Sequence, residues 1–189
     1  MKYLIDTCIF FNKLNNGEII LNSCEKVKRD SNMNCISNEI LKELEEPIHN
    51  VKNNNELYTV VKNVIFMFKR MELIDINESE VMQKNLKNIR SRFYGWQTDT
   101  VYLQKLIKDG VITPEEVKSP GFRYKDLGEC SLIAIALTSP ETYTIVTDDN
   151  GKTYKFPDQN LFNTYSDVKV VKYNSWSGKI EDCTSTCNL

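Results

Sequence analysis

Acidic side chains lie at four separate places in this chain where their carboxylates could act on one substrate. Each of these acids follows an apolar run or lies in a stretch with helical spacing. They are Asp6, Glu43, Glu129 and the neighbouring pair Asp148 and Asp149. Two carboxylates about 4 Å apart repel each other by roughly 4 kcal/mol at an effective dielectric constant near 20, so a shared site requires a cation. An oxygen-only ligand set suits Mg²⁺ or Mn²⁺ better than zinc or copper. We therefore predict one divalent-metal site, which could activate water and stabilise the charge of a phosphoryl group.

Each of these acids also has a purely structural explanation. Asp6 is a favoured residue type for capping a following helix. Glu43 could lie on a solvated helix face, and Glu129 could complement a helix dipole together with Asp126. Residues 148–151, Asp-Asp-Asn-Gly, could form only a turn. No single acid requires the metal site, and it is the occurrence of four such placements in one chain that favours it.

Short buried strands and helices would bring these acids together. Four runs predict strands, at residues 3–5, 34–37, 143–146 and 168–173. Ser37 is a natural N-cap for a helix over 38–46 that stops at Pro47, and residues 125–137 predict an apolar helix packed through small residues. In a parallel sheet, strand ends and the helix starts that follow them lie along one edge. We therefore predict an α/β fold with a parallel central sheet flanked by helices.

A long insertion separates the second and third of these strands. Helical spacing dominates residues 55–120, with a short strand-like stretch at 74–76 but no strand long enough to build a sheet. Thr113 followed by Pro114 is a strong helix start. We predict a single domain over residues 1–175 that includes a helical arm at about 55–120, followed by a polar tail at 176–189. Residues 7–30 have a mixed, helix-like pattern.

The composition excludes several classes of protein. Of the 189 residues, 41% are hydrophobic and 26% are charged, which indicates a globular domain with a real core and not a disordered chain. The net charge of −2 excludes a strongly basic nucleic-acid binder, so any such binding must use a local patch. The single histidine, His49, excludes histidine-rich metal sites and two-histidine acid–base mechanisms, which leaves carboxylates as the working groups.

The cysteines and the hydropathy pattern bear on location. Six scattered cysteines, mostly within apolar segments, are typical of reduced thiols in the cytoplasm. No apolar run approaches the ~20 residues that span a bilayer. The start of the chain has no secretion-signal pattern. We predict a cytoplasmic protein with no membrane segment.

Four short motifs, taken in order, resemble the PIN-domain nuclease family. Residues 4–7, Leu-Ile-Asp-Thr, are similar to the opening strand and first acidic residue of that family. Ser37 with Glu43 six residues later resembles its second motif, and Gly128-Glu129 before the apolar helix resembles a variant in which Glu replaces the usual Asp. Residues 147–149, Thr-Asp-Asp, resemble the closing motif. The resemblance covers residues 1–50 and 121–175 but not the helical arm.

The resemblance implies an activity and a set of site residues. It implies Mg²⁺- or Mn²⁺-dependent endonucleolytic cleavage of RNA, with Asp6, Glu43, Glu129 and Asp149 in the catalytic metal site and Asp148 as a further candidate ligand. Asp149 is preferred over Asp148 because Thr-x-Asp is the commoner arrangement in the family. Many small members are toxins held inactive by an antitoxin, so an antitoxin partner and a homodimer are expectations for this chain.

Substrate contacts and two other functions complete the sequence-based hypotheses. Substrate phosphates need cations, and we predict contacts from Arg123, Lys125 and Thr147, while Arg90 and Arg92 could equally be the solvated side of a helix. A structure-selective DNA nuclease is one alternative function. A regulatory binding module with this fold and an impaired site is the other.

Overall fold

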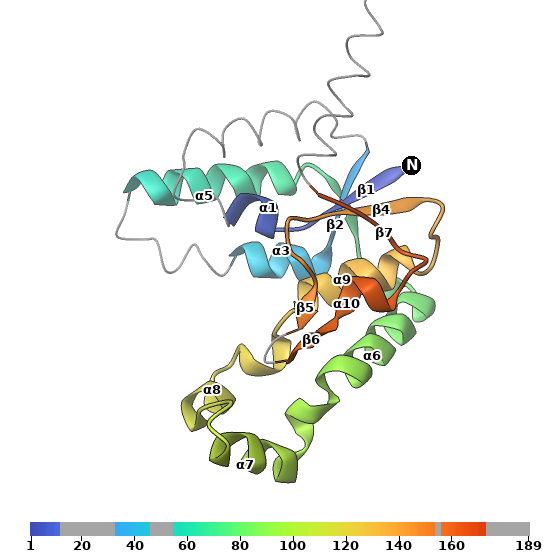
Figure 1. Cartoon of the computed structure of the whole chain (residues 1–189). Helices are drawn as coiled ribbons and strands as arrows, with labels where there is room; N and C mark the ends of the chain where they lie inside the picture. The colour runs from blue at the N-terminus through green and yellow to red at the C-terminus, as the bar shows by residue number, and fades with distance from the viewer. Residues whose placement is uncertain (12–32, 46–54, 154–155, 173–189) are drawn as a thin grey trace, which may run out of the picture.

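The computed structural model describes residues 1–11, 33–45, 55–153 and 156–172 (Figure 1). Most of the helix-like stretch at 7–30, His49 and the polar tail at 176–189 therefore lie outside the described residues. No helix within the described ranges is both long enough and apolar enough to cross a membrane.

A five-stranded sheet forms the centre of the molecule, and all of its neighbouring strands are parallel. Its spatial order is β3-β2-β1-β4-β7. The strands are β1 (Lys2–Ile5), β2 (Asn34–Ser37), β3 (Glu72–Ile74), β4 (Tyr143–Val146) and β7 (Lys169–Val171). Leu4, at the centre of the sheet, pairs with Cys35 on one side and with Ile145 on the other. The predicted α/β fold with a parallel sheet flanked by helices is confirmed.

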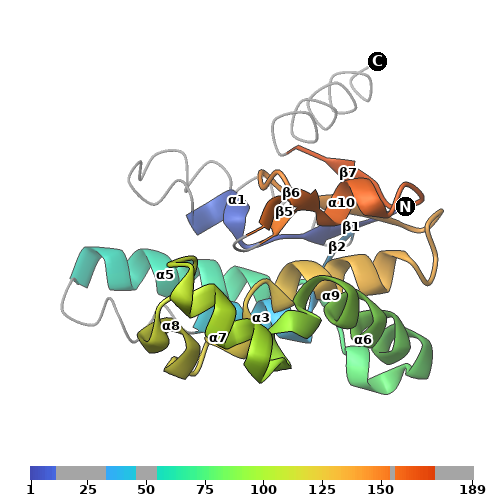
Figure 2. The same cartoon turned by 60° about the horizontal axis from the view of Figure 1, so that its bottom comes forward.

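Helices line one side of the sheet in the order α5, α3, α9 and α6 (Figure 2). Their bounds are α3 (Asn38–Glu45), α5 (Asn55–Phe68), α6 (Glu80–Tyr94) and α9 (Leu127–Ala136). Helix α9 packs against α3, α6 and the strands β2 and β4. Every residue from Cys130 to Ala136 is buried, as a helix that is apolar all round requires. This burial confirms the predicted core helix and fixes its first turn at the edge of the sheet.

The segment 55–120 is mainly helical, as expected, but it is also part of the sheet. It contains α5, β3, η1 (Ile76–Glu78), α6, η2 (Gly95–Thr98), α7 (Thr100–Lys108) and α8 (Pro114–Lys118). Strand β3 pairs in parallel with β2, so the expectation that no strand here is long enough to build a sheet is wrong. The strand covers 72–74 and not the predicted 74–76, and it ends at Ile74 because Asp75 caps η1.

The far end of this segment forms a small lobe with its own core. Leu103, Leu106, Ile112 and Phe122 are buried together, and Trp96 packs on Phe122 edge-to-face at 5.7 Å between ring centroids. In Figure 1, α6 leads away from the sheet toward α7 and α8. The helix start predicted at Thr113 and Pro114 is confirmed, and Thr113 and Glu116 also form a capping box. The chain then returns through η3 (Phe122–Tyr124) to the start of α9.

A hairpin and a short helix between β4 and β7 were not predicted from the sequence. Strands β5 (Lys152–Thr153) and β6 (Phe156–Asn160) pair antiparallel, and α10 (Leu161–Thr164) precedes β7. A short α1 (Cys8–Phe11) follows β1. The mostly polar composition of residues 150–160 hid the hairpin, although Thr153 is buried and Phe156 packs against the core of the lobe.

Candidate active site

A pocket of about 790 Å³ opens where β1 ends and α3 and α9 begin. Its lining includes Asp6, Glu43 and Glu129, three of the predicted site residues, and also Asp126. Part of the lobe contributes further lining: Glu116, Ser119, Gly121, Phe122, Tyr124 and Lys125. The parallel sheet therefore brings acids that are far apart in sequence to one cavity, at the edge where open α/β sheets bind ligands.

Asp6 is held at the end of β1 from both its backbone and its side chain. Its side chain is only 2% exposed. The backbone N–H donates to the carbonyl of Val146 at 3.0 Å, and carboxylate Oδ2 accepts from Thr147 Oγ1 at 2.6 Å. The N–H of Cys8 reaches Oδ1 at 3.4 Å, so the capping interaction is present but long. Burial raises the pKa of Asp6, and the charge of Asp149 adds to the increase.

Thr147 lies behind the acids and not on the surface of the pocket. It is fully buried, and its hydroxyl also accepts from the backbone N–H of Asp149 at 2.9 Å. The sequence suggested a contact with substrate, but this geometry assigns Thr147 to positioning Asp6 and the Asp149 turn.

The two adjacent aspartates differ in their surroundings. Asp149 Oδ1 accepts from the N–H of Gly151 at 2.7 Å, and Gly151 has a positive φ of 73°, so the predicted turn is formed. The charge of Asp149 raises the pKa of both Asp6 and Glu129. The backbone N–H of Asp148 donates to Cys8 Sγ at 3.3 Å. Neither aspartate is among the residues that line the pocket, and Asp149 is the one of the pair whose charge is known to act on Asp6 and Glu129.

Glu129, in the first turn of α9, is an acid whose pKa is raised by the charges of four other acids. Burial raises its pKa to about 10, and the charges of Asp6, Asp149, Asp126 and Glu43 contribute in that order. Its Oε2 is buried and has no hydrogen-bond partner among the described residues. A buried carboxylate oxygen without a donor is costly, so this atom is suited to a bound cation.

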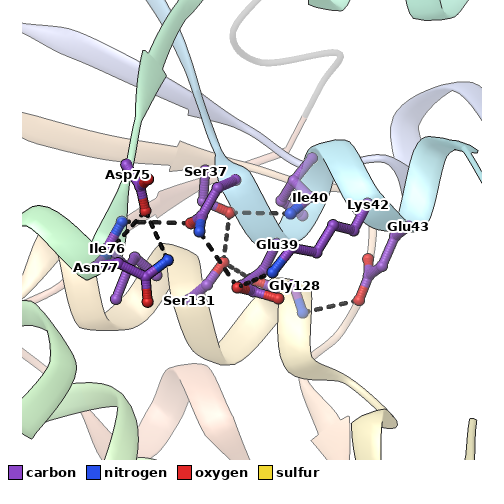
Figure 3. Close-up of polar contacts among 11 residues, drawn as sticks. Ser37, Glu39, Ile40, Lys42, Glu43, Asp75, Ile76, Asn77, Gly128 and Ser131 are labelled. Carbon is purple, nitrogen blue, oxygen red and sulfur yellow. Dashed lines mark hydrogen bonds and ion pairs between the residues drawn. The ribbon is translucent and has the colours of Figure 1, made fainter.

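Glu43 is fixed by the close crossing of α3 and α9 (Figure 3). The backbone N–H of Gly128 donates to Glu43 Oε1 at 2.8 Å. Next to this contact, Ser37 Oγ and Ser131 Oγ lie 2.6 Å apart, and Ser131 donates to the carbonyl of Gly128 at 2.5 Å. Ser37 also accepts from the N–H of Ile40, which confirms the predicted helix cap. Ser131 and the contact of Gly128 were not predicted, since they depend on how two helices cross.

A side chain at position 128 would displace the carboxylate of Glu43. A Cβ built at this position would lie 2.4 Å from Glu43 Oε2. We expect Gly128→Ala to displace Glu43 and to weaken Mn²⁺ binding about 10-fold, the lower end of the effect of losing a ligand's supporting partner. The measurement is the Mn²⁺-induced rise in Tm. Gly95→Ala is the matched control, because no heavy atom lies within 4 Å of a Cβ there and Gly95 has helical dihedral angles. Equal Mn²⁺ responses of the two variants would contradict this role of Gly128.

The donor set fits a hydrated magnesium or manganese ion. Within the described residues, no three histidine, cysteine or acidic side chains form a group that could hold a metal ion by themselves. Mg²⁺ is commonly bound through one or two carboxylates and several waters, so it does not need such a group. The unpartnered oxygen of Glu129 and the fixed carboxylate of Asp6 provide oxygens of this kind.

The cationic side chains that were considered as substrate contacts differ in their position relative to the pocket. Lys125 lines the pocket, as does Lys42 of α3. Arg123 is exposed and is not among the residues that line it. Arg90 donates to the backbone carbonyls of Arg123 and Lys125, so its guanidinium supports the pocket wall. Arg92 is exposed and lies over Phe93, with 5.5 Å from its guanidinium carbon to the ring centroid.

Comparisons with known proteins found similarity among solved structures. No protein-family model matches the chain. No curated protein matches it either. Among solved structures, a chain of VapBC2 from Rickettsia felis, bound to a DNA fragment from its promoter, is 17% identical. The match covers 92% of this chain and 99% of that chain, with a TM-score of 0.45.

Proposed function

We propose that this chain is a divalent-metal-dependent nuclease of the PIN-domain kind that hydrolyses phosphodiester bonds in RNA. One observation supports the proposal most: a buried, unpartnered oxygen of Glu129 lies within the electrostatic reach of four other carboxylates. That arrangement is unfavourable for folding alone, because like charges repel in a desolvated site. It becomes favourable when a cation neutralises the carboxylates.

The acids in the pocket have distinct tasks in this proposal. Asp6 supplies a carboxylate whose orientation is fixed by the short hydrogen bond from Thr147. Glu43 is held by Gly128, and Glu129 supplies the oxygen that has no other donor. A bound Mg²⁺ or Mn²⁺ would polarise a phosphoryl oxygen and lower the pKa of a water molecule. The chain therefore needs to position oxygens and not to supply a histidine base.

The outer part of the pocket suits a charged substrate. Lys42 and Lys125 lie on its walls, and the phosphates of a nucleic acid require such cations. Two of the outer acids are already engaged: Glu39 pairs with Lys42 at 2.8 Å, and Glu116 accepts from the backbone N–H of Thr113. Among the described residues, Glu129 Oε2 is the carboxylate oxygen of the pocket that is buried without a hydrogen-bond partner, so it is the one that calls for a cation.

Incubation of the purified chain with RNA and with single-stranded DNA, side by side, tests the proposal. We expect RNA cleavage in Mn²⁺ or Mg²⁺ and none in EDTA. Cleavage of DNA alone would replace the proposed substrate with DNA and leave the metal-dependent reaction in place. Absence of cleavage of both, together with no Mn²⁺-induced change in Tm, would contradict the nuclease and favour a regulatory binding module.

The toxin role, the antitoxin partner and the homodimer are separate parts of the proposal, and they rest on the resemblance of the acidic motifs. The test is expression of this chain in a bacterial host with and without the product of a small adjacent reading frame. Growth arrest that the second protein relieves is the expected result. Normal growth with an active nuclease would contradict the toxin role.

A further inference from the structure

The wall of the pocket that comes from the lobe carries an exposed aromatic ring. Tyr124, the last residue of η3, is 66% exposed and lines the same pocket as Asp6, Glu43 and Glu129. Lys125, the next residue, lines this pocket as well. An aromatic face next to an ammonium group is the combination with which proteins bind single-stranded nucleic acids, through base stacking and phosphate contact.

The backbone on both sides of Tyr124 is held in place by α6. Arg90 donates to the carbonyl of Arg123 at 2.8 Å and to that of Lys125 at 2.5 Å, so one guanidinium spans the residue between them. Gln97 Nε2 donates to the carbonyl of Phe122 at 2.8 Å. The carbonyls of three residues around Tyr124 are therefore fixed by side chains of the α6–η2 region.

The guanidinium of Arg90 is itself held by its neighbours. It also donates to Gln97 Oε1 at 3.0 Å, and it lies over the ring of Tyr94, 4.1 Å from the centroid. Tyr94 in turn donates to Asp126 at 2.5 Å. Phe122, two residues before Tyr124, is buried in the core of the lobe. Because the segment is fixed from these sides, the backbone that carries the exposed ring of Tyr124 is rigid, and it loses little entropy when a ligand stacks on the ring.

We propose that Tyr124 is a substrate-positioning residue that stacks on an unpaired base of RNA, beside the phosphate that reaches the acids. This inference rests on the proposed nuclease function. The pocket of about 790 Å³ is in the size range of sites that enclose small ligands, so it can admit a nucleotide of a single strand. In a duplex, stacking on the neighbouring base pairs covers both faces of a base, so a base within a helix cannot stack on Tyr124.

The test compares Tyr124→Ala with Tyr124→Phe in cleavage of a ten-nucleotide single-stranded RNA. We expect Tyr124→Ala to raise KM about 10-fold, in the lower half of the range for loss of one base-stacking contact, with kcat changed by less than about twofold. Tyr124→Phe keeps the ring and is expected to behave like the wild type. Phe66→Ala is the matched control, because Phe66 is 63% exposed but lies on α5 and does not line the pocket.

A binding measurement keeps this test separate from the proposed function. Fluorescence anisotropy of a labelled RNA 10-mer is recorded in Ca²⁺, which also takes oxygen ligands, and compared with an abasic 10-mer of the same length. We expect Tyr124→Ala to weaken binding of the base-bearing 10-mer about 10-fold and to leave binding of the abasic 10-mer unchanged. Equal losses with both 10-mers, or no loss with either, would overturn the inference even if the wild type cleaves RNA. If the wild type cleaves nothing, the same base-dependent loss would still support base stacking by Tyr124.

Discussion

Asp6→Asn is expected to reduce Mn²⁺-dependent cleavage of RNA by about 100-fold or more while the chain stays folded. The substitution keeps the size of the side chain and an oxygen that can accept the hydrogen bond from Thr147, which is 2.6 Å long in the wild type. It removes one of the negative charges that act on Glu129. Loss of a single preorganised electrostatic group in an active site costs about 10²–10³ in rate. The measurement is the single-turnover rate in Mn²⁺, with the Tm measured in EDTA as a check on folding.

The control makes the same chemical change at a different acid. Asp148→Asn is expected to stay within about threefold of the wild-type rate, because Asp149 is the aspartate of this pair whose charge raises the pKa of both Asp6 and Glu129. Asp149→Asn should resemble Asp6→Asn, since the charge of Asp149 acts on both. An Asp6→Asn chain that folds normally and cleaves as fast as the wild type would rule out the mechanism.

The parts of the fold that could be predicted are those with a local signal. Strands at 3–5, 34–37 and 143–146 are apolar runs bounded by polar residues, and all three lie in the sheet within one residue of the expected bounds. Ser37 was identified as a cap because it precedes a helical pattern, and its hydroxyl does accept from the N–H of Ile40. The apolar helix predicted over residues 125–137 was evident from amino-acid composition alone. Each of these signals is contained in a few neighbouring residues.

The parts that could not be predicted depend on contacts between distant segments. Strand β3 has three residues, two of them exposed, and is a strand only because β2 pairs with it. Gly128 looks like an ordinary helix residue until Glu43 of another helix lies against it. Arg90 sits in a polar helix pattern, and nothing local shows that its guanidinium binds the carbonyls on either side of Tyr124. Tertiary packing decides each of these roles.

Replacement of the ionisable Glu129 by neutral glutamine should stabilise the metal-free protein, and this stabilisation should grow with pH. The pKa of Glu129 is raised from an ordinary value of 4.5 to about 10, chiefly by burial. Between these two pH values the folded chain holds a proton that the unfolded chain has released. Stability therefore falls as pH rises through this range, in the absence of a cation. Glu129→Gln is neutral at every pH and removes this contribution.

The expected result is a higher Tm for Glu129→Gln than for the wild type at pH 8.5 in EDTA, with a smaller difference at pH 5. An unsatisfied buried polar group costs about 1–3 kcal/mol. In a chain of 189 residues, 1 kcal/mol corresponds to roughly 2–4 °C, so the difference at pH 8.5 should be roughly 2–12 °C. The pKa of Asp6 is also raised, so some pH dependence should persist in the variant.

Mn²⁺ should reverse the order of the two proteins. The cation stabilises the wild type by binding the folded state, whereas Glu129→Gln has lost the carboxylate oxygen that has no other partner. Thermal melts of both proteins at pH 8.5, with EDTA and with Mn²⁺, contain the whole comparison. Parallel melting curves under both conditions would mean that Glu129 is an ordinary first-turn acid of α9, and the metal site would then have to be built without it.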